Sequence, residues 1–114
     1  MAVDISGTRR LLPDAIVRVR FLTTVEGGPA TPIPPGVMFG CPFVFEGEYF
    51  DCRLLLQDQT ASISPGAAVE VALKFLWPEL VKPRLRPGAP CSLWEGKIIA
   101  EGIVARMVAD ETAA

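Results

Sequence analysis

The chain has 114 residues, half of them hydrophobic, which suffices for one domain with one core but not for two. Its formal net charge of −2 argues against a protein that holds nucleic acid by bulk charge alone. Histidine is absent, which excludes Ser-His-Asp and Cys-His catalysis and removes the commonest metal ligand. Because there is no signal-peptide pattern and no apolar run long enough to span a bilayer, we expect a cytoplasmic protein without membrane contact.

The three cysteines, Cys41, Cys52 and Cys91, form no CxxC pair. A zinc site would need a carboxylate as its fourth ligand, which is rare in structural sites. We therefore expect no metal, no cofactor and no catalytic residues. Eleven prolines and ten glycines, spread along the chain, indicate many turns and short strands rather than helices.

The first expected strand covers residues 15–24, after an irregular lead-in over residues 1–13. Its hydrophobic residues alternate with Arg18 and Arg20, which predicts one buried face and one polar face. Residues 26–29 read EGGP and end the strand, because two glycines permit a sharp reversal and proline cannot donate to a ladder.

Two further strands are expected over residues 37–45 and 49–56, joined by a tight turn at Glu46 and Gly47. Pro42 lies within the first of them and costs a ladder hydrogen bond, so we expect an edge position or a bulge there.

Closing this hairpin at Glu46 and Gly47 would bring Cys41 and Cys52 close together across the ladder. The pair would then be either a disulfide or two reduced, packed thiols, and the cytoplasmic setting favours the thiols.

The longest regular pattern in the sequence is the strand between Pro65 and Pro78. A Pro-Gly turn starts it, and Pro78 removes the backbone donor that would extend it. Alternate residues form its inner face, which predicts that all five are buried: Val69, Val71, Leu73, Phe75 and Trp77.

Residues 79–90 are rich in proline and are expected to form a long loop that carries Lys82, Arg84 and Arg86. A short strand over residues 91–94, a turn at Glu95 and Gly96, and a last strand over residues 97–108 follow. Gly102 indicates a bulge or bend in that last strand, and residues 110–114 are expected to be a loose tail.

This count gives about six one-sided strands and no helix, so the strands either stack as a sandwich or curl into a barrel. Closure into a barrel removes exposed edges, and the bulge signals at Pro42 and Gly102 suit strongly bent strands.

The order of these motifs resembles the third, C-terminal domain of the translation elongation factor Tu family. The shared features are the EGG loop, the aromatic strand ending in FVF, the SPG turn, the alternating strand that ends at a proline, and the segment LWEGKIIAEGIVARMV. The resemblance spans residues 15–108. It implies an all-β, six-stranded antiparallel Greek-key barrel over residues 14–109, present here as a stand-alone domain.

The resemblance also implies where contacts would lie. In that family the enzymatic chemistry belongs to a GTP-binding domain, and this chain has no P-loop. The family's barrel contacts the stem of acylated tRNA and the GTPase domain. At the matching positions this chain keeps two polar contact candidates, Thr31 after the glycine pair and Lys97 in the last hairpin.

Four cations, Lys82, Arg84, Arg86 and Lys97, would form a basic patch able to touch phosphates if the proline-rich loop lies near the last hairpin. As an alternative, they are ordinary solvated surface. Trp94, at the hairpin tip, is expected to stack on a base, to anchor a protein partner or to pack in the core or at its rim.

Our first hypothesis is a non-catalytic binding module that acts through protein–protein contacts, with a GTPase or a protein that recognises the elongation factor as the partner. The second is an RNA- or tRNA-binding accessory protein of translation, and the third is a small enzyme. The sequence leaves the oligomeric state open.

Overall fold

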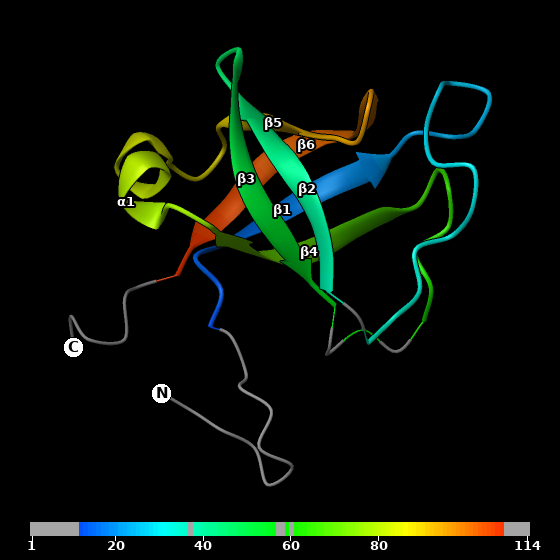
Figure 1. The fold of residues 1–114 in the computed structure, drawn as a ribbon, viewed down its shortest axis with the longest axis horizontal. Helices are drawn as coiled ribbons and strands as arrows, with labels where there is room; N and C mark the ends of the chain where they lie inside the picture. Colours follow the sequence, from blue (N-terminus) through cyan, green and yellow to red (C-terminus); the bar gives the residue numbers. More distant parts are fainter. Residues whose placement is uncertain (1–11, 37, 57–58, 60, 109–114) are drawn as a thin grey trace, which may run out of the picture.

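The computed structural model describes residues 12–36, 38–56, 59 and 61–108. These residues form β1 (Ala15–Phe21), β2 (Met38–Phe45), β3 (Glu48–Leu55), β4 (Ala68–Phe75), β5 (Pro90–Trp94) and β6 (Ile98–Met107). The strands pair antiparallel and close into a barrel in the order β1-β4-β3-β2-β5-β6 (Figure 1). The predicted all-β, six-stranded barrel is confirmed, while the N-terminal lead-in up to residue 11 and the tail after residue 108 lie outside the described residues.

The alternating patterns that predicted the strands separate the inside of the barrel from its outside. The inner side chains make one buried cluster, whose largest fully buried members are Phe21, Phe43, Phe75, Leu54, Leu56, Leu73 and Leu93. Burying each such side chain stabilises the fold by roughly 1.5–3 kcal/mol. On the outside, Arg18 lies opposite Glu70 across the β1–β4 ladder and pairs with it at 3.0 Å. The predicted polar face of the first strand is therefore confirmed.

Trp77 is not part of the buried face, and that prediction is wrong. β4 ends at Phe75, and Trp77 is 56% exposed. The chain leaves the β3–β4 ladder here. The N–H of Leu76 donates the last hydrogen bond of this ladder, to the carbonyl of Asp51, and Pro78 has no N–H to donate the next one. The alternation of apolar residues in the sequence runs on to Trp77, two residues beyond the end of the strand.

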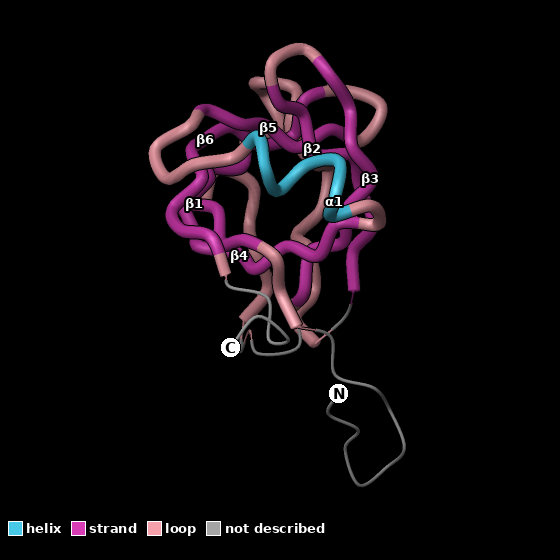
Figure 2. The backbone as a smooth tube through the Cα atoms, turned by 90° about the vertical axis from the view of Figure 1, so that its left-hand side faces the viewer, coloured by secondary structure: helices cyan, strands magenta, loops and turns pink. Residues whose placement is uncertain are grey.

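The expected loop over residues 79–90 contains a short helix, which corrects the prediction of a chain without helices. α1 (Pro78–Val81) begins with proline at its first position, where the missing N–H costs nothing, and a 3₁₀ turn (Lys82–Arg84) continues it. Val81 and Leu85 are buried, and the helix lies across one end of the barrel (Figure 2). These residues close that end of the core.

The hairpin between β2 and β3 has the predicted two-residue turn. Glu46 and Gly47 both have positive φ, 50° and 79°, as a type I′ turn requires. Cys41 lies opposite Cys52, as expected, and the Cys52 thiol donates to the carbonyl of Cys41 at 3.1 Å. Both thiols are free and buried, which agrees with the prediction of reduced, packed cysteines.

Gly102 does not mark a bulge, because the register shifts occur elsewhere, between Ile16 and Val17 and between Leu93 and Trp94. A glycine is required at position 102 for a different reason. A Cβ at this position would lie 2.0 Å from the carbonyl oxygen of Arg18, so the close approach of β6 to β1 excludes any side chain.

The end of the barrel opposite α1 is covered by the connection between β1 and β2. Within it lie residues 29–34, which we call the strap; the chain bends at Ala30 and Thr31, and Ile33 forms an isolated bridge with Ile63. Both isoleucines are buried. In Figure 1 the strap and the turn between β5 and β6 lie on the right, whereas α1 lies on the left. The two ends of the barrel are therefore built from different segments.

Candidate functional site

The four predicted cations do not form one patch. Lys82 and Arg84 belong to the 3₁₀ turn beside α1, whereas Lys97 lies in the turn between β5 and β6 at the other end of the longest axis (Figure 1). The condition on which the patch depended, that the proline-rich loop folds near the last hairpin, is not met.

Arg84 ties the α1 end to the tip of the β2–β3 hairpin. Its guanidinium contacts the carboxylates of Glu46 at 3.0 Å and Glu48 at 2.8 Å, and the hydrogen bonds that it donates to them, to Glu48 first, raise the pKa of Arg84 above its ordinary value. It also lies over the rings of Phe45 and Phe50, with centroid distances of 5.7 and 5.4 Å. This side chain is engaged in holding the fold, and its charge is matched.

Lys82 is also part of an internal network. Its ammonium lies 3.6 Å from a carboxylate oxygen of Asp14 and donates to the carbonyl of Val108 at 3.2 Å. Asp14 is buried, accepts from the backbone N–H of Phe75 at 2.8 Å and pairs with Lys74 at 3.2 Å. The carboxylate therefore joins the start of β1, the end of β4 and the 3₁₀ turn.

The remaining predicted residues at these elements are more accessible. Arg86 is exposed and forms no ion pair with a described residue. Trp94 is half-buried, and its ring meets that of Tyr49 edge to face, with centroids 5.6 Å apart. Of the three roles expected for Trp94, the structure displays rim packing, since Tyr49 and not the core is its aromatic neighbour.

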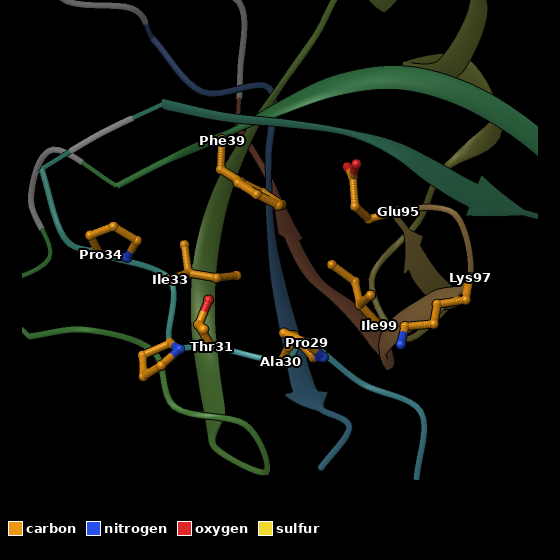
Figure 3. A pocket seen from close by; sticks show the side chains of 10 residues that line it. Pro29, Ala30, Thr31, Ile33, Pro34, Phe39, Glu95, Lys97 and Ile99 are labelled. Atoms are coloured by element: carbon orange, nitrogen blue, oxygen red, sulfur yellow. The ribbon is translucent and has the colours of Figure 1, made fainter. Parts of the chain in front are cut away.

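Thr31 and Lys97 are brought together, in a groove of about 360 Å³ at the end opposite α1 (Figure 3). One wall is the strap, the second is the turn between β5 and β6, and the remainder comes from β2 and β6. The side chains are mainly apolar, and the lining consists of Pro29, Ala30, Thr31, Pro32, Ile33, Pro34, Phe39, Glu95, Lys97 and Ile99. We refer to this feature as the groove.

A second feature, which sequence reasoning missed, lies at the α1 end. Leu76, Trp77 and Leu80 are 52%, 56% and 59% exposed. The N–H of Leu80 bonds to the carbonyl of Trp77, so these two residues share one helical turn. We call these three residues the apolar ridge. The sequence held one signal for this exposure, the proline that follows Trp77. A proline restricts the residue before it, so the strand can end ahead of Trp77 and leave Trp77 outside the ladder.

Nothing in the described residues has the geometry of a reactive or metal centre. Burial raises the pKa of the Cys91 thiol to about 12, and the hydrogen bond with Cys41, together with burial, raises that of Cys52 strongly. Such thiols are structural rather than nucleophilic. No three carboxylates or thiols in the described part of the chain gather in a way that would hold a metal ion.

None of the described helices has the length and apolar character needed to cross a membrane. Neither protein-family models nor curated proteins give a match to this chain. The relation to the elongation factor Tu family therefore stays a prediction from the motifs in the sequence.

Proposed function

We propose that this protein is a non-catalytic binding module that works in the cytoplasm through protein–protein contacts, and that its barrel is related to the third domain of elongation factor Tu. The strand order supports this relation, because β2, β3 and β4 pair in succession and β4 then lies beside β1, which precedes them in the chain, as in a Greek key. A GTPase, or a protein that recognises the elongation factor, is the partner that such a relation suggests.

The observation that carries the proposal is the apolar ridge. Three large apolar side chains within five residues, each more than half exposed, are costly to leave in water unless another surface covers them. Tryptophan is also one of the residues enriched at the energetic centre of protein interfaces. Two neighbouring cations, Lys82 and Arg84, are matched by carboxylates, so the surface beside the ridge is more apolar than the sequence of this loop suggests.

The RNA-binding alternative has less support. Two of its four cations, Lys82 and Arg84, already pair with carboxylates, and phosphate would have to compete with these internal partners. If the protein retains RNA in a salt-dependent way and Arg86→Glu abolishes that retention, the result would favour this alternative over protein binding.

A comparative pull-down tests the proposal. The immobilised protein is compared with the Trp77→Ser/Leu80→Ser double variant and with Val25→Ser, a control at the other end of the barrel whose side chain is 98% exposed. We expect a partner that the original protein and Val25→Ser both retain and that the double variant loses. Identical retention by all three proteins would overturn the proposal, because the ridge would then contribute no binding.

A further inference from the structure

The groove exists because the ladder between β2 and β5 stops early. That ladder has two residue pairs, Phe43 with Leu93 and Val44 with Ser92. Residues of a strand bond alternately to its two neighbours, so Pro42 directs its backbone toward β5, as Val44 does. Proline has no N–H to donate there. The carbonyl of Asp51, which lies opposite Pro42, accordingly bonds away from β2, to Leu76.

Beyond Pro42 the edge of β2 is therefore without a ladder partner on the β5 side. By the same alternation, Gly40 directs its N–H and carbonyl into the gap between β2 and the turn after β5. The expected edge position or bulge at Pro42 is not present, since the β2–β3 register runs through Pro42 without a shift and the barrel is closed; the proline instead lies where the β2–β5 ladder stops. A short unpaired edge beside a groove is the feature that an added extended segment can use.

The lining supplies the other half of a binding site. Ile33, Phe39 and Ile99 form an apolar floor, and the volume of about 360 Å³ falls within the size range of ligand sites. Figure 3 shows the ring of Phe39 and the side chain of Lys97 directed toward the groove from opposite walls. Lys97 forms no ion pair with a described residue, so its ammonium is available to an acidic group.

We infer that the groove binds an extended peptide segment of another protein, in which an apolar residue enters between Phe39 and Ile99 and an acidic residue pairs with Lys97. The main chain of the segment lies along the free edge of β2 at Gly40, and its N–H groups also meet the carboxylate of Glu95. Affinity comes from main-chain bonds and the buried apolar residue, and selectivity comes from the charge of Lys97.

The position of the groove favours a segment of another protein over the ends of this chain. The described residues begin at Leu12, two positions before Asp14, and end at Val108, and both Asp14 and Val108 contact Lys82 of the 3₁₀ turn beside α1. The two ends of the described chain therefore lie at the α1 end, across the barrel from the groove. The groove is also separate from the apolar ridge, so this inference does not depend on the function proposed above.

Selection from a random-peptide display library tests the inference with the intact protein as bait. We expect enriched peptides to carry an apolar residue with an aspartate or glutamate close to it. Lys97→Glu should weaken the binding of these peptides about 10-fold or more, as the loss of a charge-assisted hydrogen bond does. Thr31→Trp should also weaken it, because the larger ring occupies the groove from its exposed wall. The control is Arg86→Glu, which reverses the charge of an exposed cation at the other end and should change the affinity less than 2-fold.

Three results would overturn the inference. One is that no peptide is enriched, and another is that enriched peptides bind Lys97→Glu and Thr31→Trp as tightly as the original protein. The third is that no peptide binds, while Lys97 is needed either for binding a short double-stranded RNA or for a dimer seen in light scattering. The first of these would assign the groove to nucleic acid, and the second would assign it to a second copy of the chain. Thermal unfolding of each variant confirms that a loss of binding is not a loss of fold.

Discussion

The two ends of the barrel use charge and apolar surface in opposite ways. At the α1 end, Lys82 and Arg84 are matched by carboxylates, and the apolar ridge is exposed. At the groove end, the apolar side chains line a concave surface, and the ammonium of Lys97 has no described partner. The comparison indicates that Lys82 and Arg84 at the first end hold the structure together, whereas Lys97 at the second end is available to a ligand.

The largest effect expected for a change in the charged networks is at the α1 end, in Asp14→Ala. This change leaves the N–H of Phe75 without its acceptor and leaves Lys74 and Lys82 without their carboxylate. Losing a buried charged acceptor of this kind costs about 3 kcal/mol. Urea unfolding should therefore show a clearly lower midpoint. Lys97→Glu at the groove end is the control, and an equal loss of stability in both variants would contradict the division of roles between the ends.

A smaller effect concerns the loop that leads into the strap. Both guanidinium nitrogens of Arg20 bond to the carboxylate of Glu26 at 3.0 Å, and the N–H of Thr23 bonds to it at 2.8 Å. The hydrogen bond from Arg20, followed by that from Thr23, lowers the pKa of Glu26 from 4.5 to about 2. Because the folded-state pKa is the lower one, the stabilisation is complete above about pH 4.5 and is lost as the pH falls toward 2.

Thermal unfolding against pH checks this expectation. Glu26→Gln should lower the midpoint near neutral pH, and its difference from the original protein should shrink as the pH falls from 4.5 toward 2. Glu79→Gln, which alters an exposed carboxylate in α1, provides the control for a change of net charge at the other end. A pH-independent difference for Glu26→Gln would show that its ion pair does not anchor the loop.

The strands were predictable because their information is local. Alternation along residues 15–21 and 68–75, and the turn at Glu46 and Gly47, depend on residues that are adjacent in the chain. Neither the helix after Pro78 nor the end of β4 before Trp77 follows from such a pattern, since a four-residue helix has no period to detect. Its first-turn Pro and Glu were the weak signals present.

The candidate site was predictable only in part, because the state of a charge depends on distant partners. Thr31 and Lys97 were named from the sequence, and both line the groove. Arg84 was named as a phosphate contact, yet its partners Glu46 and Glu48 are more than thirty residues away, and those of Lys82 are also remote. The apolar ridge was missed because period-two alternation assigned Trp77 to the core.

The smallest expected effect belongs to Trp77→Asp, for which the sequence pattern alone predicts unfolding. Since Trp77 is exposed and precedes the first residue of α1, an aspartate there meets water and suits the N-cap position. We expect the free energy of unfolding, measured in urea, to change by less than about 0.5 kcal/mol. Phe75→Asp, two residues earlier and 1% exposed, should unfold the domain, because an unpaired carboxylate in the core costs several kcal/mol. Should Trp77→Asp be as damaging as Phe75→Asp, Trp77 would be a core residue, and the apolar ridge would lose the side chain on which its role as a docking surface depends.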